Sequence, residues 1–535
     1  MRLFRALQGR TVIAVVVAAT LSGVADLDGQ QPSQRNPATG GAVRAAARRY
    51  RESREVEIAK EFADLLAIPN VASDSVNIRR NAAAIIELMK RRGVAARTLE
   101  GEGGPPAVYG ELRAPGATRT VVFYAHYDGQ PVVPAQWTGS PWTPVLRDGS
   151  LAAGAKVIQI PAPGQRISGE SRIYARSASD DKGAIIAMLS ALDALKAGGI
   201  QPSVNLKFFF EGEEEAGSTN LRRLLEIHGE TLRADAWVFC DGPVHQSGRQ
   251  QVVFGARGVM GLELTTYGPS RALHSGHYGN WAPNPAALMT NLLASMRDDD
   301  GRITIAGFAD DVRPISAAER AALGTIPMID TTLRRSLMLG GTEANNASLA
   351  ERIMQPALNI RGIRVGGVRE LAANAIPTEA SASIDFRLVP DQKPERVREL
   401  VEAHLRARGY HIVHDAPDSA TRLAYPKVVR AEWDGGYAAT RASMDIPFSR
   451  ALIAASSSGA TTPPLAVPTL GGSLPTSTFE DVLGVPVVIL PIANHDNNQH
   501  ASNENLRFQN LWDGIELFAA VMARLGHEWR ESPVP

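Results

Sequence analysis

The chain has 535 residues, of which 44% are hydrophobic and 21% are charged, so it is long enough for about two to four globular domains. Lysine and arginine together number 56, as do aspartate and glutamate. This balance excludes the bulk charge that would attract nucleic acid or an anionic membrane surface. The single cysteine, Cys240, cannot form an internal disulfide.

The N-terminal residues have the pattern of a secretory signal peptide. Arginines at positions 2, 5 and 10 precede a fourteen-residue apolar run, TVIAVVVAATLSGV, and small residues occupy positions 23–25 at its end. The run is too short to span a bilayer comfortably, so the pattern predicts a signal peptide over residues 1–25. We therefore expect a secreted or periplasmic protein with no stable membrane insertion after cleavage, and an uncleaved N-terminal anchor is the alternative. Residues 26–50, which begin with a stretch rich in Gly, Pro, Gln and Ser, are expected to form a linker.

Strand-like and helix-like segments alternate through residues 51–257. The apolar side chains of EVEIAKEFADLLAIPN recur at helical spacing, and GAIIAMLSALDALKAGG is a second helix-like segment between two apolar, strand-like runs. This alternation predicts an α/β fold, namely a doubly wound catalytic domain with a mainly parallel sheet. Residues 431–535 end in a helix over about 506–525 and are expected to complete the same domain.

A different pattern occupies residues 258–430. MGLELTTY alternates apolar and polar residues, as do Ala382, Ile384, Phe386 and Leu388, and helix-like segments follow both runs. Alternation of this kind is typical of antiparallel strands with one buried face. We therefore expect an inserted α+β domain over 258–430.

Histidine and carboxylate side chains follow several of the apolar runs. VVFYA precedes His126, VNLKFFF precedes the Glu214–Glu215 pair, AWVF precedes Asp241, and VPVVIL lies upstream of His500, while Asp180 lies in SASDDKG. Because α/β sheets place their sites at the carboxyl ends of strands, these residues could converge on one crevice. A set of His and carboxylate ligands without cysteine is suited to a catalytic metal centre.

Six motifs in chain order resemble one known family. The motifs are HYDGQPVVPAQW, YARSASDDKGA, EGEEEAGS, FCDG, ALHSGHYG and QHASNEN. They are similar to the signatures of the carnosine dipeptidase, aminoacylase and carboxypeptidase G family of dinuclear zinc peptidases, and the similarity covers roughly residues 55 to 525. HYDGQPVVP, HSGHYG, FRLVPDQKP and GGSLP resemble the dipeptidase branch more than the deacylases. The resemblance implies that the inserted domain is a lid that also forms a homodimer interface.

The resemblance also implies a site with two divalent metal ions, zinc in the first place, with manganese or cobalt as alternatives. His126 and Asp241 would hold one ion, Glu215 and His500 the other, and Asp180 would bridge them. Glu214 would be the general base. Asp128 is two residues after His126 in the sequence and is expected to orient its imidazole.

Four further residues are assigned by resemblance to substrate recognition or catalysis. His274 on the lid would cross the dimer and stabilise the oxyanion. Arg387 would bind the substrate carboxylate through its guanidinium group. Asn374 and Ser473 would contact the substrate.

The motifs depart from the family pattern at two places. Ala175-Arg176-Ser177 stands where the family has Gly-Arg-Gly, and Gln499 replaces a small residue before His500. Asp241, where the deacylases commonly have glutamate, favours dipeptidase or aminopeptidase action.

These observations predict a metal-dependent peptidase that hydrolyses dipeptides or similar short peptides. An N-acyl amino acid deacylase or carbamoylase is the nearest alternative, because the same machinery would hydrolyse any amide whose flanking groups fit the lid. A binding module without activity is the second alternative, and the presence of Glu214 argues against it.

Overall fold

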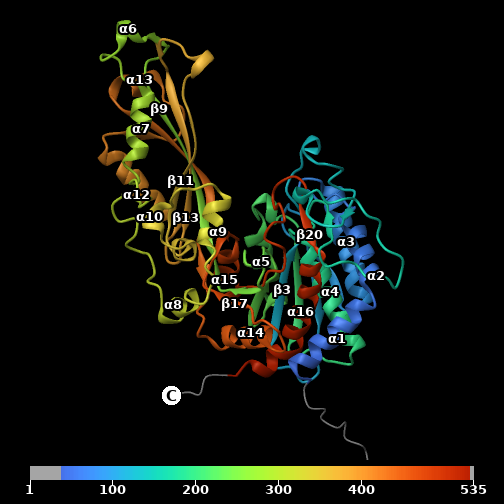
Figure 1. Ribbon diagram of the computed structural model, residues 1–535. Helices are drawn as coiled ribbons and strands as arrows, with labels where there is room; N and C mark the ends of the chain where they lie inside the picture. Colours follow the sequence, from blue (N-terminus) through green and yellow to red (C-terminus); the bar gives the residue numbers. More distant parts are fainter. Residues whose placement is uncertain (1–37, 531–535) are drawn as a thin grey trace, which may run out of the picture. The chain divides into compact units, whose positions relative to one another are not determined.

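The computed structural model describes residues 38–530 (Figure 1). The predicted signal peptide and the linker residues before 38 lie outside the described residues. Helix α1 (Gly40–Glu52) begins inside the predicted linker, so residues from 40 onward belong to the folded unit instead. Val43 and Ala47 on α1 are buried in the hydrophobic core, and Arg48 forms an ion pair with Glu516 at 2.8 Å. The apolar spacing of this alanine- and arginine-rich segment explains the difference, because it provides a helix face that can pack.

The catalytic domain contains a mixed, mainly parallel sheet of eight strands, as predicted. β3 pairs in parallel with β6 and β7, β19 with β7, and β17 with β8, while the other pairs are antiparallel. The order across the sheet is β1 (Ala95–Leu99), β2 (Ala107–Leu112), β6 (Asn205–Glu211), β3 (Thr120–His126), β7 (Ala236–Phe239), β19 (Val487–Ile489), β8 (Gln251–Val253) and β17 (Leu465–Val467).

Helices cover both faces of this sheet, which explains why the central strands are apolar throughout. Along β3, Val121 and Phe123 pack with the helices of one face, whereas Val122 and Tyr124 pack with those of the other. The first face carries α1, α2 (Glu55–Leu66), α3 (Ser75–Arg91), α4 (Lys182–Ala197), α14 (Pro447–Ser457) and α16 (Phe508–Glu528). The second carries α5 (Leu221–Leu232) and α15 (Thr476–Leu483). A small sheet of β4 (Val145–Arg147), β5 (Arg172–Tyr174) and β20 (Asn505–Arg507) adjoins the domain.

The lid is an α+β unit, as the alternating pattern indicated. Its sheet has the order β11 (Ala357–Arg364), β13 (Glu379–Leu388), β9 (Gly255–Tyr267), β15 (Val428–Tyr437) and β14 (His411–Val413). Helices α7 (Pro285–Ala294) and α12 (Pro394–Ala407) pack on one face through Met289, Leu292, Val397 and Val401. The strands extend past the expected limits of 258 and 430, because β9 begins at Gly255 and β15 continues to Tyr437.

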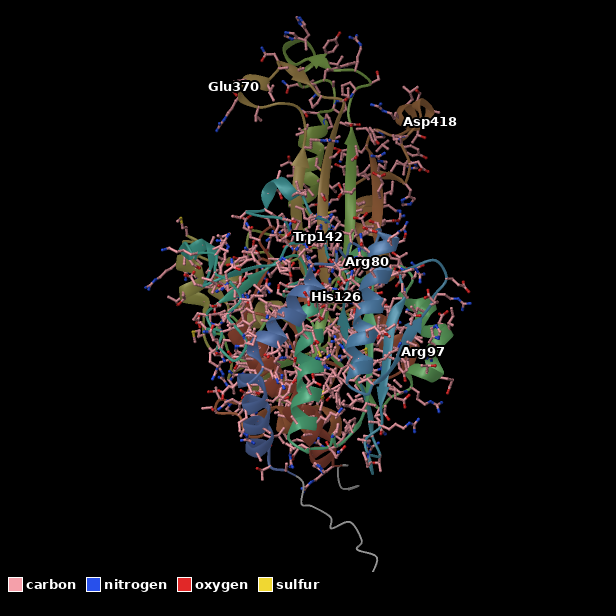
Figure 2. The ribbon with its side chains drawn as sticks, turned by 90° about the vertical axis from the view of Figure 1, so that its right-hand side faces the viewer. Arg80, Arg97, His126, Trp142, Glu370 and Asp418 are labelled. Carbon is pink, nitrogen blue, oxygen red and sulfur yellow. The ribbon has the colours of Figure 1, made fainter. Side chains whose placement is uncertain are left out.

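Two short strands join the start of β9 to the catalytic domain. β16 (Thr440–Arg441) and β18 (Leu470–Ser473) both pair with β9 near residues 255–257. The other end of β9 leads to β10 (Leu273–His274) and α6 (Ser275–Tyr278), with β12 (Ala375–Ile376) beside β10. Figure 2 shows His126 inside the catalytic domain, and Glu370 and Asp418 at the far end of the lid. The start of β9, not its far end, therefore adjoins the catalytic domain.

Short helices connect α7 to β11. They are α8 (Ala317–Leu323), α9 (Asp330–Ser336), α10 (Glu343–Asn346) and α11 (Leu349–Ile353). A further helix, α13 (Ser419–Ala424), precedes β15.

The packing of α1 predicts that Val43→Asp lowers the free energy of unfolding by roughly 3 kcal/mol or more, because it buries an unpaired charge. Ala42→Asp introduces the same charge at an exposed position of the same helix and should change stability little. Urea denaturation of the full chain measures both. Equal, small effects of the two substitutions would mean that residues 40–52 are a linker after all.

Candidate active site

The predicted ligand residues converge at the carboxyl ends of the strands. His126 is the last residue of β3, Asp241 lies two residues beyond β7, and Glu214 and Glu215 begin a short 3-10 helix (Glu214–Ala216) beyond β6. Asp180 lies just before α4, and His500 lies in the loop between β19 and β20. The sheet therefore delivers these side chains to one place, as expected from the strand-end rule.

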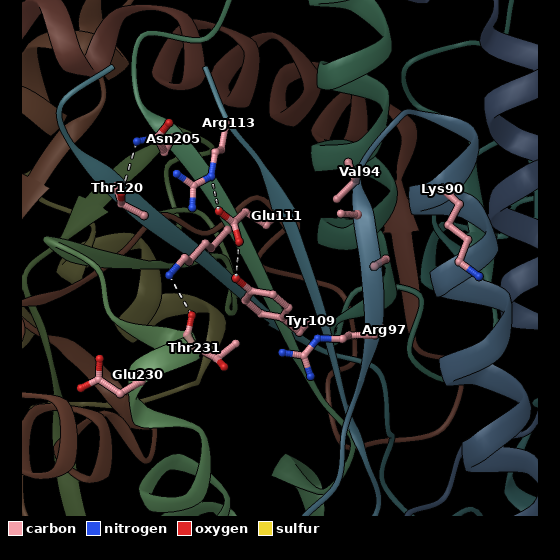
Figure 3. Close-up of a pocket in the computed structure, with 13 residues that line it drawn as sticks. Lys90, Val94, Arg97, Tyr109, Glu111, Arg113, Thr120, Asn205, Glu230 and Thr231 are labelled. Atoms are coloured by element: carbon pink, nitrogen blue, oxygen red, sulfur yellow. Dashed lines mark hydrogen bonds and ion pairs between the residues drawn. The ribbon is translucent and has the colours of Figure 1, made fainter. Parts of the chain in front are cut away.

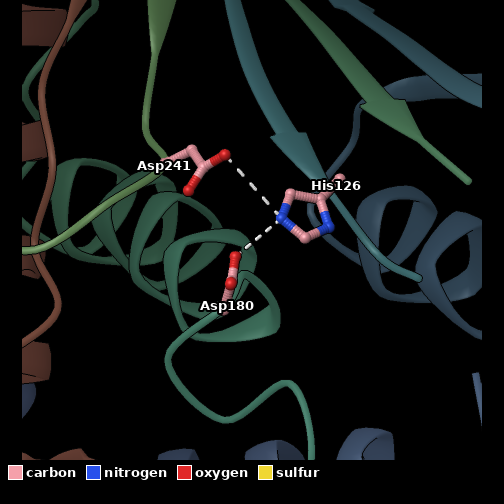
Figure 4. A group of neighbouring side chains, drawn as sticks. All are labelled: His126, Asp180 and Asp241. Carbon is pink, nitrogen blue, oxygen red and sulfur yellow. Dashed lines mark hydrogen bonds and ion pairs between the residues drawn. The ribbon is translucent and has the colours of Figure 1, made fainter. Parts of the chain in front are cut away.

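His126, Asp180 and Asp241 form one potential metal-ligand group (Figure 4). The Nε2 atom of His126 lies 2.8 Å from Asp180 Oδ1 and 3.8 Å from Asp241 Oδ2. All three side chains are buried. A nitrogen and two carboxylate oxygens that converge in this way form a donor set suited to a divalent cation.

Asp180, Glu215 and His500 form a second group. His500 Nε2 lies 3.1 Å from Asp180 Oδ2 and 3.2 Å from Glu215 Oε2. Asp180 therefore faces the first group with Oδ1 and the second with Oδ2. Among the described residues, the buried Oδ2 atom has no hydrogen-bond partner of good geometry. Such an atom fits a bridging carboxylate better than a structural one.

Asp128 connects the first group to the pair of glutamates. Its Oδ1 lies 3.3 Å from His126 Nδ1, on the side of the ring away from Asp180. The same carboxylate accepts hydrogen bonds from the backbone N–H groups of Glu214, at 3.1 Å, and of Glu215, at 3.0 Å. One fully buried side chain thus orients the imidazole and fixes the backbone that carries both glutamates.

The electrostatics of the site favour bound cations. Hydrogen bonds with Asp180 and Glu215 raise the pKa of His500 to about 11. Burial, together with the charge of Asp180, raises the pKa of Asp241 to about 7. Burial raises the pKa of Glu214 well above its usual range, and the charges of Asp241 and Glu215 add to the effect. The carboxylates thus outnumber the cationic side chains available to balance them, and two divalent ions would supply that balance.

A cavity of about 560 Å³ opens beside both ligand groups and reaches Arg387 on the lid. Asp241 and His500 line one part of it. Arg387 donates a hydrogen bond to Ser473 Oγ at 2.8 Å and forms an ion pair with Asp385 at 3.1 Å. Two of the residues predicted to recognise substrate, Arg387 and Ser473, therefore lie together at the same cavity as the potential ligands Asp241 and His500.

His274 and Asn374 lie elsewhere. Both are exposed, and Asn374 accepts a hydrogen bond from the N–H of Ser275, next to His274. His274 follows the far end of β9, a strand of 13 residues, which spans roughly 40 Å at about 3.3 Å per residue. Asn374 directly precedes β12, which pairs with the strand β10 that contains His274. Figure 1 shows α6 at this end of the lid strands. Neither residue lines the cavity of its own chain.

Glu504 is a residue at the site whose role the sequence did not indicate. It is fully buried, and it accepts hydrogen bonds from Ser177 N (2.9 Å), Ser179 N (2.9 Å), Ser179 Oγ (3.0 Å) and Asp180 N (3.0 Å). Arg176 Nη1 donates to it at 2.7 Å. This carboxylate therefore holds the loop that carries Asp180. The QHASNEN motif contains Glu504, but only the fold shows what it contacts.

Tyr437, at the end of β15, is a second such residue. Burial raises the pKa of its hydroxyl, as does the negative charge of Glu214, whereas the positive charge of Arg387 opposes the rise. Tyr437 therefore lies within the influence of both the expected base and the expected carboxylate ligand. No sequence pattern distinguished it from any other tyrosine.

A separate cavity of about 650 Å³ lies at the sheet edge beside β1 and β2 (Figure 3). Several of its polar and charged groups are engaged with one another or with the backbone. Glu111 pairs with Arg113 at 3.0 Å and accepts a hydrogen bond from Tyr109, and Lys207 donates to the carbonyl of Thr231 at 2.7 Å. None of the potential metal ligands lines it. We therefore place the chemistry at the cavity that contains Asp241 and His500.

Comparison with known proteins agrees with this geometry. The chain is 27% identical over 498 residues to the Cys-Gly metallodipeptidase dug1 of Schizosaccharomyces pombe, covering 89% of this chain and 94% of the relative. It is 25% identical over 437 residues to the human Beta-Ala-His dipeptidase, covering 79% and 78%. The crystal structure of an M20 family metallo-carboxypeptidase, Sso-CP2 from Sulfolobus solfataricus, superposes with a TM-score of 0.71 at 27% identity, covering 88% of this chain and 99% of that one.

These relatives correct the predicted location. The Dug1 metallodipeptidases are cytosolic enzymes, so the prediction of a secreted or periplasmic protein is contradicted. The N-terminal pattern behind that prediction lies in residues 1–25, outside the described part of the chain. Within residues 38–530, no helix combines the length and the apolar character needed to span a membrane.

The model of the peptidase family M20/M25/M40 matches residues 122–524, which include all of the potential metal ligands. The chain therefore belongs to the M20/M25/M40 peptidase family, and it is a peptidase.

Proposed function

We propose that the protein is a dinuclear metal-dependent dipeptidase. The observation that carries this proposal is Asp180, whose two oxygens face two separate groups of histidine and carboxylate ligands. The relatives are named as metallodipeptidases for Cys-Gly and as a dipeptidase for Beta-Ala-His. Dipeptides are therefore the proposed substrates. A deacylase or carbamoylase activity is not favoured by these relatives, and the intact Glu214 argues against an inactive module.

The donor set supports zinc as the metal, with manganese or cobalt as alternatives, because imidazole and carboxylate ligands suit all three ions. His126 and Asp241 would hold one ion, Glu215 and His500 the other, and Asp180 both. When bound, two such ions lower the pKa of a water and polarise a carbonyl oxygen.

The side chains of the chain perform the remaining steps. The carboxylate of Glu214 takes a proton from the attacking water and delivers it to the nitrogen of the leaving amine. The backbone N–H of Glu214 donates a hydrogen bond to Asp128, which also contacts His126, so Glu214 is held beside the proposed metal site for this exchange. Arg387, held by Ser473, binds the carboxylate at the C-terminus of the dipeptide and so orients the amide bond.

His274 and Asn374 are proposed to act on the site of a partner subunit in a homodimer. They lie too far along the lid to reach the cavity of their own chain, yet His274 is exposed and its imidazole can donate a hydrogen bond. A second copy of the lid would place this donor near the developing oxyanion.

The proposed function predicts that metal-loaded protein hydrolyses dipeptides with free termini much faster than their C-terminal amides or the matching N-acetyl amino acids. For the amides, the reason is that amidation removes the charge that pairs with Arg387. Amine release from matched substrates measures the difference. Faster hydrolysis of N-acetyl amino acids would favour the deacylase function instead.

Glu214→Gln is expected to lower kcat by about two to four orders of magnitude while metal content stays the same, because only the proton transfer is lost. Glu215→Gln removes a proposed ligand and should lower metal content. Elemental analysis and turnover of both variants separate the two roles. Retention of full activity by both variants would exclude these assignments.

Glu504→Gln is expected to weaken metal binding by about tenfold or more. The substitution replaces one acceptor oxygen by an NH2 group, which cannot accept hydrogen bonds from the N–H groups of the Asp180 loop. Competition with a chromophoric chelator measures the affinity. Glu55 is a matched control, since it is equally buried and accepts hydrogen bonds from Arg51, Arg166 and the backbone N–H of Ile167. Glu55→Gln should lower the stability of the fold without changing metal affinity. Native affinity in Glu504→Gln would contradict a positioning role.

The proposed dimer predicts complementation between two inactive variants. Neither a His274→Ala nor a Glu214→Gln homodimer should turn over substrate. Mixed dimers, refolded from both chains, should contain one site with a native Glu214 and a native His274 from the other subunit. Recovery of about half of the native turnover per mixed dimer is expected from this count of sites. A correctly refolded mixture without activity would show that His274 acts within its own chain.

A further inference from the structure

The cavity beside the metal ligands has one wall made of apolar side chains from the lid. This wall comes from the segment that contains α8 to α11, which connects α7 to β11. Its members are only partly buried, and they belong to none of the three hydrophobic clusters of the described residues. The apolar wall consists of Leu323, Ile326, Pro327, Ile329, Leu349 and Ile353.

The apolar wall shares its cavity with Asp241, His500 and Arg387. A Cβ atom added to Gly242, the residue after Asp241, would lie 3.8 Å from Leu470 Cδ2, so Leu470 is close to this loop. A Cβ atom added to Gly471 would lie 3.2 Å from Ile353 Cδ1, so Ile353 is close to Gly471. Leu470 and Gly471 belong to strand β18, so Ile353 packs beside this strand. The strand begins near Asp241 and ends at Ser473, which accepts a hydrogen bond from Arg387.

A second contact fixes the end of α11 near the same place. Arg257, at the start of β9, donates a hydrogen bond to the carbonyl of Gln355 at 2.8 Å. Ser473 pairs with Arg257 in the sheet, and the positive charge of Arg387 lowers the pKa of Arg257 after the larger effect of burial. The residues just after Ile353 therefore lie beside the guanidinium group of Arg257, whose partner in the sheet, Ser473, accepts a hydrogen bond from Arg387.

This placement decides which part of a substrate meets the apolar wall. A dipeptide with its amide at Asp241 and His500, and its carboxylate at Arg387, has its C-terminal residue between the two. The side chain of that residue would therefore face Ile353 and Leu470. The only charged side chain on this stretch of the lining is Asp330, and its Oδ1 already accepts a hydrogen bond from the N–H of Leu349 at 2.7 Å.

We propose that the apolar wall is the binding site for a bulky apolar side chain on the C-terminal residue, so that the preferred substrates are dipeptides ending in Leu, Ile, Met or Phe. This inference rests on the proposed dipeptidase function. Partly buried apolar groups that belong to no core lose their remaining contact with water when such a side chain binds. The cavity of about 560 Å³ is within the range of about 300 to 1,000 Å³ that is usual for small-molecule sites.

The first test compares four dipeptides with the same N-terminal residue, namely Ala-Leu, Ala-Met, Ala-Gln and Ala-Gly, on the native, metal-loaded protein. The kcat/KM for Ala-Leu should exceed that for Ala-Gly by roughly tenfold to a hundredfold, as expected for an apolar side chain that fills a hydrophobic pocket. Ala-Met and Ala-Gln have C-terminal side chains of similar length and separate apolar character from size. The kcat/KM for Ala-Met should exceed that for Ala-Gln by at least about tenfold.

The second test changes the apolar wall. In Ile353→Gln, the ratio of kcat/KM for Ala-Met to that for Ala-Gln should fall by roughly threefold to tenfold. A ratio measured on one preparation is independent of how much of the protein is folded. Met328→Gln is the matched control, because Met328 lies on the same segment but is 88% exposed and does not line the cavity. The ratio should not change in this variant.

The outcomes also distinguish this inference from the proposed function. Hydrolysis of Ala-Gly and Ala-Gln at least as fast as Ala-Leu and Ala-Met would overturn the inference and leave the dipeptidase function intact. An unchanged ratio in a folded Ile353→Gln variant would overturn the role of the apolar wall. Absence of turnover with all four dipeptides, in protein that holds two metal ions, would refute both proposals.

Discussion

The arrangement of the site depends on where Asp180 is held. Its side chain faces both ligand groups, so a small shift of its loop would disturb both at once. Glu504 fixes that loop through hydrogen bonds from Ser177, Ser179 and Asp180 itself, and it lies four residues after His500. One buried carboxylate therefore ties together two segments that are more than 300 residues apart in sequence. Burial alone would favour the neutral acid, and the several donors around it, including Arg176, oppose this.

Negative charge is concentrated around the side chain of Asp180. Asp180, Glu214, Glu215 and Asp241 lie close enough together that burial and mutual repulsion shift the pKa values of Glu214 and Asp241 upward. Such a cluster is costly unless cations bind there. The fold sustains this cost because Glu214, Glu215 and Asp241 closely follow the ends of buried strands. The apolar faces of β3, β6 and β7 provide that rigid support.

The lid is joined to the site through the beginning of β9. There β18 runs from Leu470, near Asp241, to Ser473, which contacts Arg387. A single short strand therefore relates the expected position of the amide bond to the expected position of the carboxylate. Ile353 of the apolar wall lies beside the same strand. The strand β18 therefore passes close to the expected positions of the amide bond, the substrate carboxylate and the C-terminal side chain.

The sequence by itself was sufficient for the class of chemistry and the fold class. Apolar runs long enough for buried strands preceded His126, the glutamate pair and Asp241, and the strand-end rule then placed these residues together. The alternating segments likewise indicated an inserted α+β domain. These inferences succeeded because they rest on local patterns, namely period, run length and residue type.

The tertiary structure decided what local patterns do not contain. Residues 40–50 resembled the end of a linker, but they belong to α1, which packs against α16 because Val43 and Ala47 contact an apolar surface more than 460 positions away. The partners of Glu504 and the position of Ile353 depend on which loops meet, and the exposed place of His274 depends on the length and direction of β9. A residue's type and its neighbours in sequence determined which ligands this protein could offer to a metal. Only the packing of distant segments determined which residues hold those ligands in place and what shape of substrate they face.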